Sequence, residues 1–183
     1  MNIPIKRTFD IFLSIILLLL IGWFILLLIF LSFIDTGKGL FLQTRVGQYG
    51  KLFTIYKIRS MQVCCGTISR YGYFLRNSKF DELPQLLNIL GGQMSFVGPR
   101  PDVPGYYDRL QGEERKILEL KPGLLSRAAL KYYNEEDILN AQQVPLKYND
   151  EVIFPDKVRM NLDYYYKRSL REDIKILVAF VFR

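Results

Sequence analysis

Two adjacent acids, Asp81 and Glu82, stand at the start of an apolar segment that reads DELPQLLNIL. Ser78 could form a capping box with Asp81, in which the acid only completes a helix start. With Ser78 as the N-cap, however, Pro84 would fall inside the helix, where it removes a hydrogen bond and clashes. With Asp81 at or near the N-cap, Pro84 falls in the first turn and disturbs nothing. We therefore expect the helix to begin at the acid pair and to end at Leu90.

Acids at a helix start are kept ionised by the helix dipole. An ionised Asp81 next to Glu82 is suited to be a nucleophile beside a Mg²⁺ ligand. Simple capping accounts for the same two residues, so the pair alone leaves both interpretations open.

Four basic side chains surround this segment. Arg76 precedes it, Lys57 and Arg59 lie in IYKIRSM, and Arg100 stands between two prolines in GPRP. Arginine forks match phosphate oxygens, and a stiff backbone lowers the entropy lost on binding. Each base taken singly is explained as a solvated surface charge. Together with the acids they supply what phosphoryl transfer needs, which is an attacking anion, a group of cations and a metal.

The composition favours an anionic partner and excludes several classes of site. The chain has 183 residues, a net charge of +7 and a pI near 9.4. Histidine is absent, which excludes Ser-His and Cys-His nucleophiles and histidine metal sites. We expect no nucleic-acid binding, since there is no zinc motif, no helix-turn-helix pattern and no basic run longer than two. The adjacent Cys64 and Cys65 indicate a reducing, cytosol-facing environment.

A membrane segment is predicted at Ile11–Ile34, which is 24 residues without a charge. As a straight helix it would extend roughly 36 Å, enough for a hydrocarbon core of about 30 Å. It is too long for the apolar core of a signal peptide. Gly22 beside Trp23 could mark a bend, and the flanking charges fit both a spanning helix and one that returns to the same side.

The remaining elements are predicted from pattern. Two short β segments are expected around Gly47–Gly50, and helices over Tyr106–Leu120 and Asn134–Gln143. The tail from Asp163 to Arg183 is basic and aromatic first and apolar last. It is expected to be a helix that lies on a membrane surface or packs on the core.

Over nearly its whole length the chain resembles the bacterial sugar transferases, the monotopic phosphoglycosyl transferases. The resemblance begins at KRTFDIFLS, continues through FLQTRVGQYGKLFTIYKIRSM, is densest in FLRNSKFDELPQLLNILGGQMSFVGPRPDVPGY and includes KPGL. The resemblance implies an α+β fold with a re-entrant N-terminal membrane helix over residues 1–35. A small catalytic domain over 36–183 would follow, with mainly interfacial helices, a short β-hairpin and a C-terminal interfacial helix. It would lie on the cytoplasmic face of the bacterial inner membrane.

The implied reaction transfers sugar-1-phosphate from a UDP-sugar to undecaprenyl phosphate, the first membrane step in the assembly of exopolysaccharide, capsule or lipopolysaccharide. The resemblance makes Asp81 the nucleophile that forms an aspartyl phosphosugar and Glu82 the Mg²⁺ ligand. It makes Arg76 and Arg100 phosphate-binding residues. Lys57 and Arg59 would contact the lipid phosphate or a headgroup.

The chain departs from the family pattern at several points. Ile21-Gly22-Trp23 replaces the usual Ser-Pro pair of the membrane helix, and the loop after Met61 is short. Gln93 stands for an Asp, Leu125-Ser126 for Thr-Gly, and Tyr133 for a frequent Arg. These changes leave open a catalytically decayed, membrane-anchored paralogue that binds polyprenyl phosphate or a partner. A basic scaffold without a ligand is a third interpretation. A homodimer is compatible with the sequence, although no residue requires it.

Overall fold

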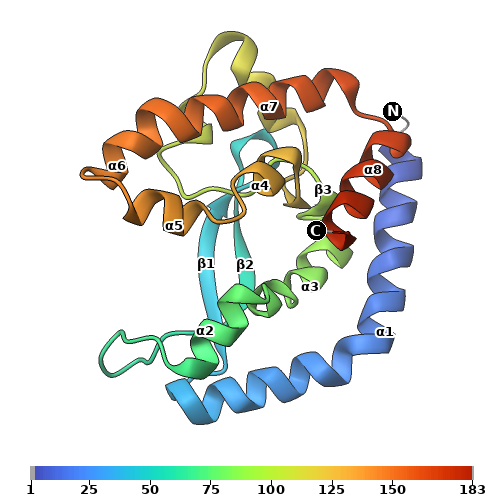
Figure 1. Ribbon diagram of the computed structural model, residues 1–183. Coiled ribbons are helices and arrows are strands. Elements are labelled where there is room, and N and C mark those ends of the chain that lie inside the picture. Colours follow the sequence, from blue (N-terminus) through green and yellow to red (C-terminus); the bar gives the residue numbers. More distant parts are fainter. Residues whose placement is uncertain (1–2, 183) are drawn as a thin grey trace. The chain divides into compact units, whose positions relative to one another are not determined.

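The computed structural model describes residues 3–182 (Figure 1). Met1, Asn2 and Arg183, at the ends of the two predicted domains, lie outside the described residues. The helices are α1 (Ile3–Thr36), α2 (Arg70–Asn77), α3 (Gln85–Leu90), α4 (Arg127–Lys131), α5 (Glu135–Asn140), α6 (Pro145–Tyr148), α7 (Phe154–Lys167) and α8 (Leu170–Val181). The strands are β1 (Leu40–Val46), β2 (Leu52–Ile58), β3 (Ser95–Val97) and β4 (Gly123–Leu125). The predicted mixture of helices and a small sheet is confirmed.

The chain divides into two compact units. The first, here called the anchor unit, consists of Pro4–Arg45 with Leu52–Met94. The second, the C-terminal unit, consists of Val46–Lys51 with the chain from Ser95 onward. The acid pair lies in the anchor unit, and Arg100 lies in the C-terminal unit.

Helix α1 is the membrane candidate of the anchor unit. Its segment Pro4–Thr36 is long and apolar enough to cross a membrane, by length and composition. Figure 1 shows α1 bent part-way along its length. Near its middle the indole Nε1 of Trp23 donates a hydrogen bond to the carbonyl of Leu20 at 3.0 Å. Residues 5–36 contain no proline, so the bend is not a proline kink.

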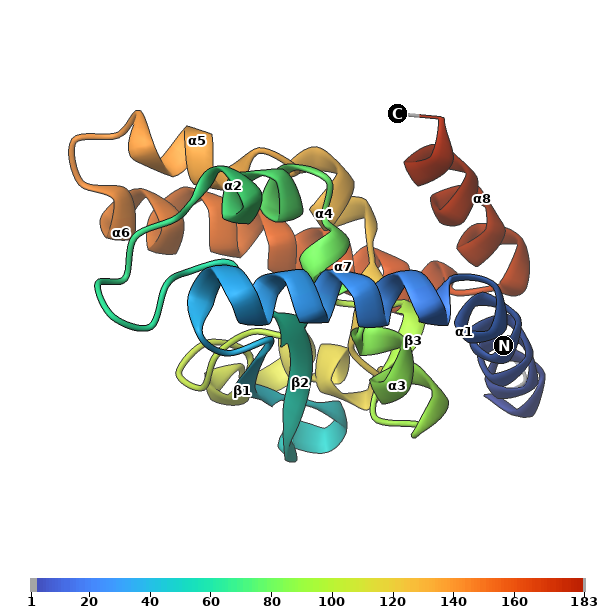
Figure 2. The ribbon, with the colours of Figure 1, turned by 90° about the horizontal axis from the view of Figure 1, so that it is seen from below.

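Both ends of α1 are bound to the anchor unit. Near its beginning, Arg7 donates to the carbonyls of Ile89 and Leu90, both at 2.6 Å, which are the last two residues of α3. A helix leaves its last carbonyls without intrahelical partners, so this fork satisfies two of them. Near its end, the Ser32 hydroxyl donates to the carbonyl of Arg59 at 2.6 Å. Figure 2 shows this half of α1 beside α2 and the β1–β2 ribbon.

The predicted hairpin is confirmed as β1 and β2, which pair in a two-stranded sheet. The connection is closed by the amide of Gly47, which donates to the carbonyl of Lys51 at 2.8 Å. Tyr49 and Gly50 turn the chain with φ of 57° and 76°. Left-handed backbone at two successive positions makes this connection tight, and Gly50 adopts it without strain.

The acid pair lies just before the helix that we expected it to begin. Asp81 and Glu82 are in a 3₁₀ turn, Phe80–Glu82, and α3 starts at Gln85 with Pro84 as its N-cap. The capping-box interpretation is wrong, since the Ser78 hydroxyl donates back to the carbonyl of Phe74 at 2.7 Å. Ser78 thus ends α2 instead of starting the next helix.

The C-terminal unit contains a parallel strand pair that the sequence analysis did not predict. Strand β3 pairs with β4, with Ser95 opposite Gly123 and Val97 opposite Leu125. Where the pair ends, Gly98 and Gly123 approach so closely that a Cβ on Gly123 would lie 2.1 Å from the Gly98 nitrogen. The SFVGPRP and KPGL motifs are therefore neighbours in space.

The helix expected over Tyr106–Leu120 is replaced by two 3₁₀ segments, Tyr107–Arg109 and Gly112–Glu119. The prediction of one amphipathic helix is wrong because Leu110 is extended and Gly112 has φ of 56°. Both segments still bury apolar residues in the core of this unit, which comprises Val46, Tyr107, Leu110, Ile117, Leu118 and Val158.

The other two helical predictions are confirmed in outline. Helix α5 occupies the region predicted over Asn134–Gln143. The tail forms the end of α7 and then α8, which has Ser169 as its N-cap. One face of α8 buries Ile176, while Ile174 and Val178 on the other face are exposed.

Candidate functional site

The centre of the site is an ion cluster between β2 and the 3₁₀ turn Phe80–Glu82. The Nζ of Lys57 lies 3.0 Å from Glu82 Oε1 and 3.9 Å from Asp81 Oδ2. The three side chains are largely buried, with 17% of Lys57, 12% of Asp81 and 9% of Glu82 exposed. One ammonium thus faces two carboxylates where solvent screens little.

The backbone before the acids turns in a conformation that L-residues seldom adopt. Lys79 has φ of 57° and is the N-cap of the 3₁₀ turn. Its carbonyl accepts from the amide of Glu82 at 3.1 Å, and its amide donates to the carbonyl of Arg76 at 3.2 Å. This left-handed residue reverses the chain between α2 and the acid pair. Backbone strain of this kind gathers at functional sites.

Asn88, on α3, holds that helix against β2, the strand that carries Lys57. Its side chain is fully buried. Its Oδ1 accepts from the amide of Tyr56 at 3.1 Å, and its Nδ2 donates to the carbonyl of Thr54 at 2.8 Å. The neighbours of Lys57 on β2 are thereby bonded to α3. Pattern analysis missed this residue because a single Asn within a helical stretch gives no signal.

Arg76 and Arg59 lie near the end of β2. The Nε of Arg76 donates to the Ser60 hydroxyl at 3.0 Å. The guanidinium of Arg59 lies over the Phe41 ring, 5.3 Å from its centroid, and its carbonyl accepts from Ser32. The Arg76 side chain thus contacts Ser60, which directly follows Arg59 in the chain. Arg59 lies two residues beyond Lys57. The structure places Lys57, Arg59, Arg76 and the acid pair in one unit.

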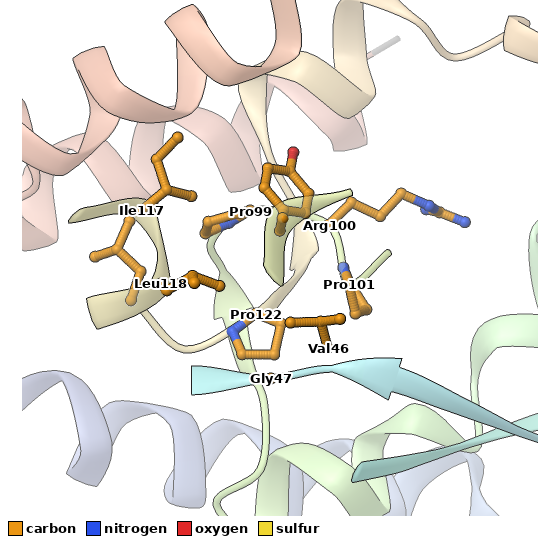
Figure 3. Close-up of a pocket in the computed structure, with 10 residues that line it drawn as sticks. Val46, Gly47, Pro99, Arg100, Pro101, Ile117, Leu118 and Pro122 are labelled. Carbon is orange, nitrogen blue, oxygen red and sulfur yellow. The ribbon is translucent and has the colours of Figure 1, made fainter. Parts of the chain in front are cut away.

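Arg100 is held in the C-terminal unit by the stiff segment that the sequence indicated. Pro99 and Pro101 are buried, while Arg100 is partly exposed. These residues line an open pocket of about 240 Å³ whose other walls include Ile117 and Leu118. Figure 3 shows the Arg100 side chain extending away from these apolar walls. The prolines therefore position the backbone and direct the guanidinium outward.

The donor set of the anchor unit suits a hard divalent cation that is only partly held by protein. Asp81 and Glu82 supply adjacent, largely buried carboxylates. Among residues 3–182 no group of three or more His, Cys, Asp or Glu side chains gathers in a metal-binding arrangement. Mg²⁺ is commonly bound by one or two carboxylates together with substrate phosphates and water. The residues present fit that mode.

The sequence profile of the family described as "Bacterial sugar transferase" matches residues 1–183. The chain belongs to this family. The resemblance stated from the motifs is therefore confirmed over the whole length.

The names of curated relatives of this sugar transferase refer to exopolysaccharide production or to sugar-phosphate transfer with undecaprenyl phosphate. It is 37% identical over 151 residues to the exopolysaccharide production protein PSS of Rhizobium leguminosarum bv. phaseoli, covering 72% of this chain and 76% of the relative. It is 32% identical over 205 residues to the UDP-glucose:undecaprenyl-phosphate glucose-1-phosphate transferase of Escherichia coli K12, covering all of this chain and 40% of the relative. The undecaprenyl-phosphate galactose phosphotransferase of Salmonella typhimurium LT2 is 34% identical over 147 residues, or 66% of this chain and 31% of the relative. The chain thus spans less than half the length of the Escherichia coli and Salmonella typhimurium relatives.

Two departures from the family pattern have a structural role in this sugar transferase. The Gln93 Oε1 accepts from Asn88 Nδ2 at 2.8 Å, so an amide oxygen serves where relatives place a carboxylate. The Ser126 hydroxyl accepts from the amide of Ala129 at 2.9 Å and caps α4. Neither change disturbs the ion cluster of the anchor unit.

The two cysteines lie exposed in the loop between β2 and α2, with their sulfurs 3.3 Å apart. A hydrogen bond with the Thr67 hydroxyl, at 3.0 Å, lowers the pKa of Cys65 below its usual value. The hydrogen bond with Cys65 raises the pKa of Cys64. The thiolate is the reactive form, so Cys65 is the more reactive thiol near neutral pH.

We expect iodoacetamide at pH 8 to alkylate Cys65 several-fold faster than Cys64, measured by mass spectrometry of the peptide that contains both. As the pH is raised well above 9, both thiols ionise and the difference shrinks. Thr67→Val removes the hydroxyl and should abolish the preference at pH 8. Equal rates in the unmodified chain would contradict the assignment.

Proposed function

We propose that this chain transfers sugar-1-phosphate from a UDP-sugar to undecaprenyl phosphate through an aspartyl phosphosugar intermediate. The observation that carries the proposal is the buried cluster of Asp81, Glu82 and Lys57 in the anchor unit. The names of two relatives, which specify a sugar phosphate and undecaprenyl phosphate, supply the substrate class. A buried carboxylate is costly without a compensating charge, and the Lys57 ammonium supplies one beside both acids.

In the first step an oxygen of the Asp81 carboxylate attacks the sugar-bearing β-phosphorus of the UDP-sugar. The bond from that phosphorus to the bridging oxygen breaks, and UMP leaves with the electron pair. In the second step a phosphate oxygen of undecaprenyl phosphate attacks the same phosphorus. The bond to Asp81 breaks, which restores its carboxylate and yields undecaprenyl diphosphosugar. Both attacking oxygens are already ionised, so neither step needs a general base. This agrees with the absence of histidine from the chain.

The other side chains of the anchor unit bind and orient. Arg76 and Arg59 present guanidinium groups near the end of β2 and would bind phosphate oxygens. Lys57 holds Glu82 at 3.0 Å and so fixes the carboxylate next to the nucleophile. In the C-terminal unit, Arg100 retains the phosphate-binding role that the resemblance implies, supported by its rigid Pro-Arg-Pro backbone.

We propose Mg²⁺ as the cofactor, with Glu82 as its protein ligand. Bound there, the ion would neutralise charge on the diphosphate. The support is the pair of adjacent, largely buried carboxylates beside Lys57.

The cation in this cluster gives a stability test of the metal site. Lys57→Met leaves two largely buried acids without the ammonium, and we expect it to lower the free energy of unfolding by about 2 kcal/mol or more. Mg²⁺ should raise the melting temperature of this variant more than that of the unmodified chain, compared with NaCl at equal ionic strength. Lys147→Met, which removes an exposed ion pair with Glu151, is the matched control and should change little. Equal melting temperatures with and without Mg²⁺ would contradict the site.

We infer that α1 enters the bilayer and returns to the same side, with the region after residue 35 on the cytoplasmic face of the inner membrane. The support is the bend in Figure 1 and the attachment of both ends of α1 to one unit. A helix that crossed the bilayer would separate Arg7 from Ser32 by the hydrocarbon core.

This topology can be tested by labelling cysteines from one side. In a background in which Cys64 and Cys65 are serine, Ile5→Cys and Lys38→Cys mark the two ends of α1. An impermeant maleimide should label both only after spheroplasts are lysed. Labelling of the Ile5→Cys variant in intact spheroplasts would contradict re-entry.

The reaction is tested by UMP release. The chain, purified in lipid nanodiscs, is given a panel of UDP-sugars with undecaprenyl phosphate and Mg²⁺. Multiple-turnover UMP release that needs both the lipid and Asp81 is the expected result and identifies the sugar. A folded chain that releases none across the panel would favour the decayed paralogue.

A further inference from the structure

A row of aromatic rings connects the middle of α1 to the turn that carries the acid pair. The rings of Trp23 and Phe24 have centroids 5.9 Å apart, and Phe24 lies 5.5 Å from Phe80. Phe80 in turn lies 5.8 Å from Phe74 on α2. All four residues belong to the anchor unit, and Phe80 precedes Asp81 directly in the chain. We call Trp23, Phe24, Phe74 and Phe80 the aromatic row.

The row is fixed on one side and open on the other. Phe24 and Phe80 are partly buried and pack against the core residues Leu28, Ile58 and Leu75. The two end members are exposed, Trp23 by 68% and Phe74 by 50%. The inner rings are therefore held in place, while the outer rings offer apolar surface next to the membrane helix.

We propose that the aromatic row binds the first isoprene units of the polyprenyl phosphate acceptor. This inference rests on the proposed function, which places the phosphate of that lipid at Asp81. Consecutive Cα atoms are 3.8 Å apart, so a phosphate at Asp81 brings the lipid chain within reach of Phe80. The chain must then leave along an apolar surface, because exposing it to the ion cluster would cost hydrophobic free energy.

The polar and apolar sides of the turn separate the two ends of the acceptor. Lys57 and the carboxylates occupy the side that faces β2. The row occupies the side that packs on α1. Flat ring faces also suit the planar double bonds of isoprene units, and they offer large contact areas with little loss of side-chain entropy. A saturated bulk lipid has neither the phosphate monoester for the polar side nor the planar double bonds for the aromatic row.

Trp23 is the only tryptophan in the chain, so its emission reports on the row directly. In nanodiscs made with brominated phosphatidylcholine, the exposed indole should be quenched by bulk lipid. Undecaprenyl phosphate at low mole fraction should relieve the quenching in a saturable manner, since a bound chain shields the ring. Undecaprenol, which lacks the phosphate, should give little relief at the same mole fraction. Equal relief of Trp23 quenching by both lipids, or no relief by either, would overturn the proposal. The measurement does not require catalytic turnover.

Kinetics supply the second arm. Phe74→Leu should raise the KM for undecaprenyl phosphate about fivefold and leave the KM for the UDP-sugar within twofold. Phe33→Leu is the matched control, since Phe33 is 57% exposed on α1 and takes part in none of the ring contacts found among residues 3–182. An equal rise in KM for the control would mean general lipid contact and would overturn the proposal. A chain that binds the lipid as expected but releases no UMP would count against the proposed function only.

Discussion

Asp81→Asn is expected to lower the rate of UMP release by on the order of a thousandfold or more, since an amide cannot form the covalent intermediate. Folding should be affected little. Lys57 keeps its contact with Glu82 at 3.0 Å, and asparagine retains the size of the Asp81 side chain and one of its acceptor oxygens. We expect the free energy of unfolding to change by about 1 kcal/mol.

A single-turnover experiment identifies the nucleophile without the lipid acceptor. The unmodified chain, mixed with the UDP-sugar and Mg²⁺ alone, should release a burst of UMP that approaches one per active site. Asp81→Asn should give no burst, whereas Asp163→Asn, which alters a surface ion pair with Lys167, should retain it. A burst of normal size from the Asp81 variant would place the covalent bond elsewhere.

Gly123→Ala is expected to destabilise the C-terminal unit by about 3 kcal/mol or more. The added Cβ would lie 2.1 Å from the nitrogen and 2.5 Å from the carbonyl oxygen of Gly98. These are backbone atoms within a paired strand region, so no side chain can rotate to relieve the clash. Strands β3 and β4 would have to separate, and the hydrogen bond from the Gly98 amide to the Leu125 carbonyl, at 3.0 Å, would be lost.

Thermal or denaturant unfolding of the purified chain measures this effect. Gly22→Ala is the control, because no atom lies within 4 Å of the position that its Cβ would occupy. We expect the control to unfold close to the unmodified chain. A Gly123→Ala variant as stable as the control would contradict the close approach of the two motifs.

The features predicted from the sequence are those that local patterns determine. The hairpin follows from two alternating segments around Gly47–Gly50, and the apolar length of α1 from its composition. The acid pair was placed near the start of a helix because Pro84 limits where that helix can begin. In each case the decisive information lies within a few residues of the element itself.

Features that depend on distant residues were not predicted. The pairing of β3 with β4 joins segments too short to show a strand pattern, and only the structure shows that Gly98, just after β3, approaches Gly123 at the start of β4. The contact of Lys57 with Glu82 brings together residues from β2 and the 3₁₀ turn, so spacing gave Lys57 only a general role as a cation. The break at Leu110 and Gly112 interrupts a segment whose apolar periodicity favoured one helix.

The fork of Arg7 has a consequence for the biogenesis of this protein. Its partners, the carbonyls of Ile89 and Leu90, lie 82 and 83 positions further along the chain. Helix α1 therefore leaves the ribosome and meets the membrane well before α3 exists. In the re-entrant topology proposed above, α1 can be locked only after α3 has been made, and the same event completes the helix that follows the proposed nucleophile. Under that proposal, the membrane topology and the catalytic centre form together, late in synthesis.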